Sequence, residues 1–309
     1  MNRRRVLTER VHPRSEGLDL ATFGEVVRLL HVEDGAAVAA VRRVLPQVAR
    51  VAAVAAEALR AGGRLVYVGA GTSGRLGVLD AAEVPPTFGT EPWQVVGIIA
   101  GGRAALTRSV EGAEDDAKAG ARSVRALRVG PKDLVCGISA SGSTPFVLGA
   151  LAQARRSKST TALVCCNPGP RASRLADLLV APRTGPELIA GSTRLKAGTA
   201  TKLILNAISS AAMVSLGRVY RGRMVDLAPA NRKLTARARA IVADLTGLSE
   251  TRAAALLAKA HGSPRVAIAM HLTGESRAAA ERRLKSVGLR TLEPLAPTGN
   301  PKRRSRASR

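Results

Sequence analysis

The chain has 309 residues, 46% of them hydrophobic, which is enough for one large domain or two smaller ones with an ample core. It carries 48 Lys and Arg against 23 Asp and Glu, a formal net charge of +25. Because these basic residues are spread along the chain and only 2% of residues are aromatic, there is little material for stacking bases, and we expect no specific nucleic-acid partner.

The amino-terminal part predicts an arm followed by two helices. Residues 1–20 have little core-forming pattern, and their start lacks the apolar core of a signal peptide. Residues 21–61 predict two helices, the second beginning or kinking at Pro46 and ending at Gly62-Gly63. Since no apolar run in the chain reaches membrane-spanning length, we expect a cytoplasmic protein with no membrane partner.

The next segment alternates short apolar runs with helical patterns. The predicted strands are 64–68, 94–100, 133–138, 161–166 and 178–180. The predicted helices between them are 74–83, 104–120 and 145–155. This α/β pattern predicts a doubly wound parallel five-stranded sheet flanked by helices. Three cysteines fall in the apolar runs, which indicates buried free thiols and a reducing compartment: Cys136, Cys165 and Cys166.

The loop Gly69–Gly74 follows the first predicted strand, and a short helix then carries Asp80 and Glu83 to a break at Pro85-Pro86. The loop matches the glycine pattern of dinucleotide sites. The second strand, however, ends in Ala100-Gly101-Gly102, without the acidic residue that would bind a ribose, so nicotinamide and flavin are not favoured. A strand, a loop rich in N–H groups and a helix start instead predict a site for an anion such as a phosphate.

A second loop, residues 139–145, reads Ser-Ala-Ser-Gly-Ser-Thr-Pro and places four hydroxyls before a helix start. One interpretation is a turn with a helix N-cap. The other is a phosphate cradle built from hydroxyl and backbone N–H groups. Because a cap needs one hydroxyl and the loop offers four, the phosphate cradle is favoured.

Carboxylates are the natural acid–base groups of the sheet region, because no histidine lies between His31 and His261. A Ser-His-Asp triad from this region and a histidine-ligated metal are therefore excluded. Glu83 stands close to the first loop. A second group gathers between the second and third strands, and its last two members are interpreted as solvated helix surface: Glu111, Glu114, Asp115 and Asp116.

A long helix is predicted over residues 192–220, and three charged residues surround its entrance: Glu187, Arg194 and Lys196. These side chains would either contact a ligand or cap the helix. From Leu234 to about residue 290 the pattern predicts a small all-helical domain with Gly247, Gly262 and Gly274 as breakers. We expect four parts: an amino-terminal arm with helices (1–55), the sheet domain (56–220), the helical domain (221–295) and a disordered basic tail (296–309).

Several motifs occur in order along the chain: VGAGTSGRLGVLDAAEVPPTFG, GIIAGG, SVEGAEDD, GISASGSTPFV, CNPG, GPELIAGSTRLKAGTATKL, MVDL and NRKL. From Leu7 to Leu295 the chain thereby resembles the N-acetylmuramic acid 6-phosphate etherases of the sugar isomerase (SIS) fold superfamily. The resemblance implies cleavage of the D-lactyl ether of that sugar phosphate, giving N-acetylglucosamine 6-phosphate and D-lactate, in cell-wall recycling and without metal or redox cofactor. One SIS unit per chain implies a homodimer.

The resemblance also implies roles for individual residues. Glu83 would protonate the leaving lactate oxygen, and Glu114 would be the second catalytic carboxylate, handling water and the C2 proton. The residues expected to bind the phosphate or the sugar are Thr72, Ser73, Ser139, Ser141, Ser143, Thr144, Glu187 and Lys196. Many members have Arg at the position of Ser143. The alternatives are a phosphosugar isomerase and a non-catalytic sugar-phosphate sensor on the same fold.

Overall fold

The structure is a computed structural model that describes residues 10–167, 170–227 and 232–292. The predicted basic tail, 296–309, lies outside these residues. The chain divides into two compact units. The first combines Met1–Pro86 with Thr90–Ser215, and the second combines Thr87–Gly89 with Leu216–Arg309. No helix of the described ranges is long and apolar enough to cross a membrane.

A five-stranded parallel sheet forms the centre of the first unit, as the sequence predicts. Its strands, in the spatial order β2-β1-β3-β4-β5, are β1 (Leu65–Gly69), β2 (Val95–Ile99), β3 (Leu134–Ile138), β4 (Thr160–Val164) and β5 (Leu178–Val180). Gly69 pairs with Ile99 on one side and with Ile138 on the other. The carboxyl ends of β2, β1 and β3 therefore meet at one edge, where the strand order reverses and ligands bind such sheets.

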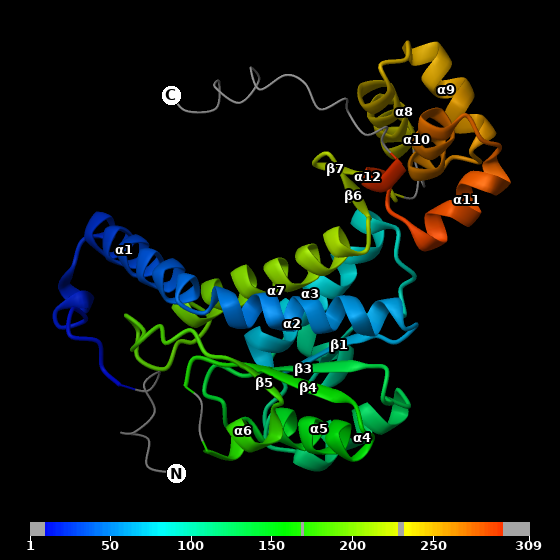
Figure 1. The fold of residues 1–309 in the computed structure, drawn as a ribbon. Coiled ribbons are helices and arrows are strands. Elements are labelled where there is room, and N and C mark those ends of the chain that lie inside the picture. The colour runs from blue at the N-terminus through cyan, green and yellow to red at the C-terminus, as the bar shows by residue number, and fades with distance from the viewer. Residues whose placement is uncertain (1–9, 168–169, 228–231, 293–309) are drawn as a thin grey trace. The chain divides into compact units, whose positions relative to one another are not determined.

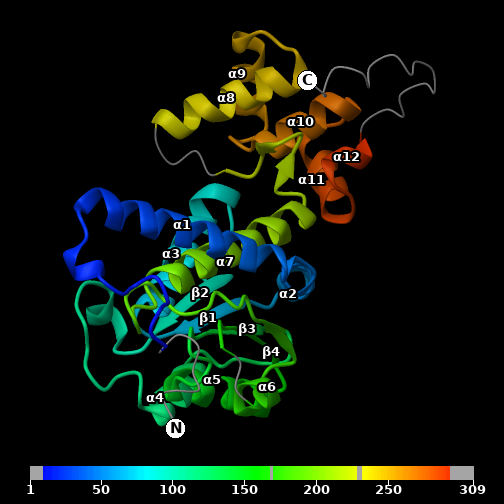
Figure 2. The ribbon, with the colours of Figure 1, turned by 90° about the vertical axis from the view of Figure 1, so that its left-hand side faces the viewer.

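Helices cover both faces of the sheet (Figure 1). One face carries α2 (Leu45–Arg60), α3 (Gly71–Phe88) and α7 (Lys196–Ser215), and the other carries α4 (Ala117–Ala126), α5 (Pro145–Arg156) and α6 (Pro170–Leu175). Because successive strand side chains alternate, Val66, Val68 and Val135 pack toward α5 while Tyr67 is buried on the opposite face. Helix α1 (Phe23–Arg42) packs on α7 (Figure 2).

Two glycines let α4 and α5 approach each other closely. A Cβ added to Gly120 would lie 1.9 Å from the Phe146 carbonyl oxygen, and one added to Gly149 would lie 2.0 Å from the Ala117 carbonyl oxygen. Neither position therefore tolerates a side chain without displacing backbone. This close packing holds the start of α5 next to the chain that precedes α4.

The predicted break at Pro85-Pro86 is wrong, because α3 runs from Gly71 to Phe88 through both prolines. The helix also starts three residues before the predicted Gly74, since the Gly74 N–H donates to the Ala70 carbonyl and closes a turn there. Both prolines stand in the final turn, so the helix loses only the bonds that their N–H groups would donate to the Ala81 and Ala82 carbonyls.

The single helix predicted over 104–120 is also wrong. A short 3-10 helix, η4 (Gly102–Leu106), is followed by ten residues outside any helix, and α4 begins only at Ala117. Two features explain the interruption. Gly112 has a φ of 70°, and the Asp116 side chain caps α4 by accepting from the Ala119 N–H. The irregular stretch 107–116 is the one that carries Glu111 and Glu114.

The second unit is built from a two-stranded hairpin and helices. Its elements are β6 (Val219–Tyr220), β7 (Arg223–Met224), α8 (Arg232–Thr246), α9 (Glu250–Lys259), α10 (Pro264–Thr273), α11 (Arg277–Ser286) and α12 (Leu289–Leu292). The predicted breakers Gly247, Gly262 and Gly274 all have positive φ and separate the helices. The helix predicted over 192–220 is shorter, since α7 ends at Ser215 and Gly217 adopts a φ of 71°.

The three cysteines are buried and free, as predicted. Burial raises the pKa of Cys136 and of Cys165 to about 12 and that of Cys166 to about 11. They therefore remain neutral thiols and act as small apolar side chains.

Candidate active site

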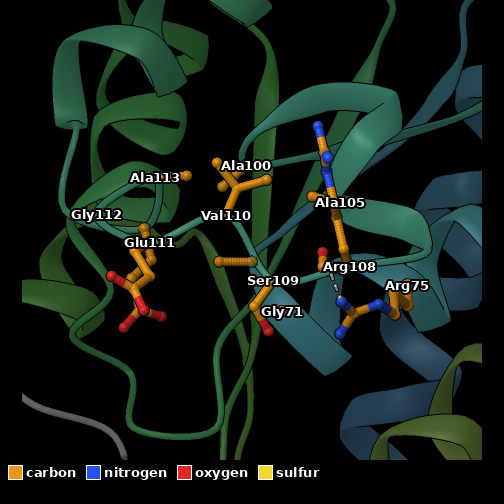
Figure 3. Close-up of a pocket in the computed structure, with 12 residues that line it drawn as sticks. Gly71, Arg75, Ala100, Ala105, Arg108, Ser109, Val110, Glu111, Gly112 and Ala113 are labelled. Carbon is orange, nitrogen blue, oxygen red and sulfur yellow. Dashed lines mark hydrogen bonds between the residues drawn. The ribbon is translucent and has the colours of Figure 1, made fainter.

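A cavity of about 340 Å³ opens at the carboxyl edge of β1 and β2 (Figure 3). Its lining comes from the end of β1, the start of α3, η4 and the irregular stretch before α4: Ala70, Gly71, Arg75, Ala100, Ala105, Arg108, Ser109, Val110, Glu111, Gly112, Ala113 and Glu114. A volume of this size is at the lower end of the range for small-molecule sites. Its charged lining consists of two guanidinium groups and two carboxylates.

The second predicted loop lies beside this cavity, at the end of the neighbouring strand β3. Ser139 is 2% exposed, and its hydroxyl lies 2.8 Å from the Thr144 hydroxyl and 3.4 Å from that of Ser141. The Ser143 hydroxyl donates to Ser141 at 2.9 Å. Thr144 is the N-cap residue of α5, yet its side chain accepts no capping hydrogen bond. The hydroxyls thus gather in one cluster instead of capping the helix.

Glu114 connects the cavity with the hydroxyl cluster. Its side chain is exposed and lines the cavity, while its backbone carbonyl accepts from the Phe146 N–H of the first turn of α5 at 2.9 Å. This bond fixes the backbone of Glu114 next to the first turn of α5, which directly follows the loop 139–144. Glu114 and the hydroxyl loop are thus close in the fold, and their sharing one site stays a prediction.

Thr72 and Ser73 stand in the first turn of α3, directly after the cavity residue Gly71. Both are half-buried. A Cβ added to Gly198 of α7 would lie 3.7 Å from the Thr72 methyl group, so Thr72 also faces the start of α7.

Glu83 is exposed on α3 and does not belong to the cavity lining. At a rise of about 1.5 Å per residue, the twelve residues from Gly71 to Glu83 extend roughly 18 Å along the helix. Of the two predicted catalytic carboxylates, Glu114 lines the cavity and Glu83 does not.

Asp80, one turn before Glu83, is buried and accepts from the Tyr67 hydroxyl at 3.0 Å and the Ser209 hydroxyl at 3.1 Å. Burial raises the pKa of Asp80 above its usual value, although these two hydrogen bonds oppose the rise. The charge of Glu83 also acts to raise that pKa, by less than burial does. Asp80 fixes α3 against β1 and α7.

Glu187 caps α7. Its carboxylate is fully buried and accepts from the Lys196 and Ala197 N–H groups, each at 3.0 Å. Burial raises the pKa of Glu187, against the lowering effect of those two N–H groups. Of the two interpretations offered by the sequence, helix capping is the one observed for this side chain.

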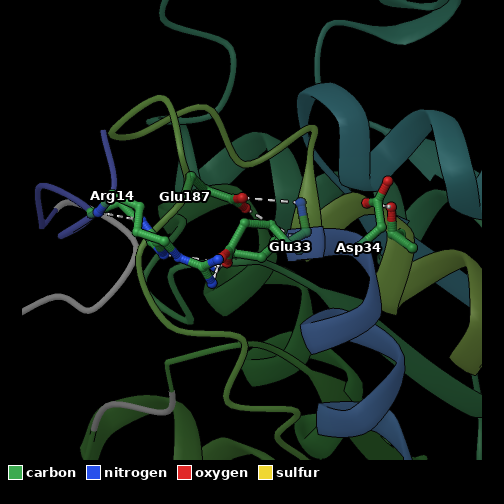
Figure 4. Close-up of polar contacts among 8 residues, drawn as sticks. Arg14, Glu33, Asp34 and Glu187 are labelled. Atoms are coloured by element: carbon green, nitrogen blue, oxygen red, sulfur yellow. Dashed lines mark hydrogen bonds and ion pairs between the residues drawn. The ribbon is translucent and has the colours of Figure 1, made fainter. Parts of the chain in front are cut away.

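Lys196 also forms contacts within the fold, with the cluster around Glu33 (Figure 4). Its ammonium group is buried and forms an ion pair with Glu33 of α1, which in turn accepts from Arg14 at 2.6 Å and lies 3.2 Å from the His12 ring. Burial would raise the pKa of Glu33, but the hydrogen bond and charge of Lys196, with His12 and Arg14, hold that pKa below its usual value. Arg194, in contrast, is exposed.

The Glu33 cluster predicts an acid-sensitive contribution to stability. Since the pKa of Glu33 is lower in the folded chain than the ordinary glutamate value of about 4.5, its contribution to stability is present above about pH 4.5 and is lost as the pH falls below that value. Glu33→Gln should lower the free energy of unfolding near pH 7 by about 1–3 kcal/mol and flatten its pH dependence below pH 4.5. Urea unfolding from pH 3 to 7 measures this. Glu57→Gln, an exposed carboxylate of α2, should change little; an equal loss there would contradict the assignment.

Arg108 and Ser109 are cavity residues that sequence reasoning missed. They directly precede the acidic motif, and this nearness in sequence to Glu111 and Glu114 could have identified them as site residues. Within the described ranges no group of three or more His, Cys, Asp or Glu side chains is arranged to hold a metal ion.

Comparisons with known proteins agree with this architecture. Residues 47–155 match the family model described as the glucokinase regulatory protein N-terminal SIS domain. An N-acetylmuramic acid 6-phosphate etherase from Cutibacterium acnes is 50% identical over 281 residues, covering 91% of this chain and 92% of the relative. Another from Gloeobacter violaceus is 50% identical over 286 residues, covering 93% and 94%. A third, from Salmonella typhimurium, is 47% identical over 284 residues, covering 92% and 96%.

Proposed function

The chain belongs to the N-acetylmuramic acid 6-phosphate etherase family, and we propose that the cavity at the carboxyl edge of its sheet is where the D-lactyl ether of that substrate is cleaved. The observation that carries this proposal is the position of Glu114. Its side chain lines the cavity while its backbone is bonded to the start of α5, beside the four-hydroxyl loop. A carboxylate and a phosphate cradle thereby share one site.

In the proposed reaction the sugar ring first opens, so that C1 becomes an aldehyde and the C2 hydrogen becomes acidic. Glu114 removes the C2 proton, the C3–O bond breaks, and Glu83 protonates the departing lactate oxygen. Water then adds to the C2–C3 double bond, placing hydroxyl on C3 and hydrogen on C2. Each proton moves between a carboxyl group and substrate or water, as general acid–base catalysis requires.

The hydroxyl loop and the start of α3 would bind the phosphate. The hydroxyl cluster at the end of β3 consists of Ser139, Ser141, Ser143 and Thr144. Since the side chain of the N-cap residue Thr144 does not cap α5, these hydroxyls are available to a ligand. Thr72 and Ser73 occupy the first turn of α3, where N–H groups and the helix dipole favour an anion. Glu187 and Lys196 would support this site indirectly, because their contacts fix the start of α7.

We propose that the protein acts as a homodimer in the cytoplasm. Several large apolar side chains of the first unit are exposed, among them Phe23 at 94%, Val27 at 64% and Leu79 at 40%. Leu79 lies one turn before Glu83 on α3, so a partner that covers it would also cover the catalytic carboxylate. Three buried free thiols are in keeping with a reducing compartment.

The proposal is tested by incubating purified protein with N-acetylmuramic acid 6-phosphate and measuring D-lactate and N-acetylglucosamine 6-phosphate in equal amounts. An isomerase would produce a new sugar phosphate without lactate. A sensor would bind the substrate, and raise the melting temperature, without turnover. Either outcome would replace the etherase assignment.

A further inference from the structure

The proposed substrate carries two anionic groups, and the residues assigned so far account for one of them. The phosphate on C6 is matched by the hydroxyl loop and the start of α3. The carboxylate of the lactyl group lies next to the bond that breaks, close to where Glu83 and Glu114 must act. Without a cation nearby, a carboxylate entering a site that already holds Glu111 and Glu114 would be repelled.

The cavity lining offers two cations, Arg75 and Arg108. In Figure 3 the Arg75 guanidinium lies near Gly71 and Ser109, whereas the Glu111 carboxylate lies on the other side of the cavity. A substrate anion seated near Arg75 would therefore lie away from the negative charge of Glu111.

Arg75 is held in place by the segment that it faces. Its Nε donates to the Leu106 carbonyl at 3.1 Å and its Nη2 to the Arg108 carbonyl at 3.3 Å. A guanidinium has five N–H donors, so three remain for a ligand. The side chain is half-buried and fixed at two points, which lowers the entropy cost of binding. Arg108, in contrast, is exposed, and its guanidinium has no hydrogen bond or ion pair among the residues that the structure describes.

We infer that Arg75 binds the lactyl carboxylate of the substrate and so selects for the lactyl ether among sugar phosphates. The inference rests on the proposed function. It assigns the hydroxyl loop to the phosphate and Arg75 to the carboxylate. A bidentate guanidinium–carboxylate pair has the strength and the direction to orient the ether oxygen toward its acid.

The test compares ligands that differ in this one group. The ligands are N-acetylmuramic acid 6-phosphate, its lactamide analogue, in which the carboxylate is a neutral amide, and N-acetylglucosamine 6-phosphate, which has the phosphate alone. The proteins are the wild type, Arg75→Gln, Arg75→Lys and Arg108→Gln. Arg103→Gln is the matched control, because Arg103 of η4 is exposed and does not line the cavity.

We expect Arg75→Gln to lower kcat/KM and affinity for the carboxylate substrate by roughly 10- to 100-fold. The lactamide analogue and N-acetylglucosamine 6-phosphate should be affected less than about threefold, and Arg75→Lys should recover part of the loss. The control Arg103→Gln should behave as wild type.

Three results would overturn the inference. Equal weakening of N-acetylglucosamine 6-phosphate would assign Arg75 to the phosphate. Equal loss for all three ligands, with a lower melting temperature, would make Arg75 a purely structural tie for residues 106–108. A carboxylate-selective loss in Arg108→Gln instead would move the subsite to Arg108. Because wild-type affinities are measured too, failure of lactate release would refute the proposed function separately.

Discussion

Replacing Glu83 or Glu114 by glutamine is expected to lower kcat for D-lactate release by about 10²- to 10⁴-fold each, the range for loss of a general acid or base. Glutamine keeps the size and hydrogen-bonding oxygen of the side chain but cannot deliver or accept the proton. Since both side chains are exposed, neither substitution should cost much stability, so the loss should appear in kcat at unchanged melting temperature.

The two proposed roles can be separated by exchange at C2. In deuterium oxide, Glu83→Gln should still exchange the C2 hydrogen with solvent, because Glu114 is intact and only protonation of lactate is impaired. Glu114→Gln should lose both exchange and lactate release. The reverse pattern would interchange the roles. Asp115→Asn and Glu91→Gln are matched controls, since both carboxylates are exposed and lie outside the cavity lining.

The sheet could be predicted because its information is local. Five short apolar runs are separated by helices. The three inner strands β1, β3 and β4 are almost entirely buried, and burial on both faces leaves a continuous apolar sequence in each of them. The prediction failed at 104–120, where an alanine-rich sequence of high helix propensity leaves helical structure after Leu106, passes through Gly112 at positive φ and becomes helical again after the Asp116 cap. Helix propensity alone favoured one continuous helix, whereas the Asp116 cap begins a separate helix, α4, after η4 has ended.

The site was predictable where residue type carries the chemistry and obscure where contacts are long-range. The hydroxyl loop and the acidic motif stand out in the sequence, and Glu114 and Phe146 then meet through one backbone bond. The partners of Lys196 and Arg75 could not be read from the sequence. Glu33 lies 163 residues from Lys196, and the Leu106 carbonyl lies 31 residues from Arg75. No sequence periodicity links such distant residues. For Glu187, its position before a predicted helix was compatible both with capping that helix and with binding a ligand.

The separation of Glu83 from the cavity leads to the second large effect, restoration of activity in a mixed dimer. Glu83 stands about 18 Å along α3 from Gly71, at the 1.5 Å rise of a helix, and is exposed beside Leu79. If two copies pair through this face, each site would combine Glu83 of one chain with the partner subunit's Glu114. A symmetric dimer would then contain two such shared sites.

A heterodimer of Glu83→Gln and Glu114→Gln chains, purified through two different tags, should then have about half of the wild-type activity, because one of its two sites receives both intact carboxylates. Each homodimeric variant should be inactive. A heterodimer of wild type with the double variant is the inverse control: with shared sites each site lacks one carboxylate and activity is lost, whereas with sites inside one chain half remains. An inactive first heterodimer beside a half-active control would therefore place both carboxylates in the same chain, and the exposed face of α3 would need another explanation.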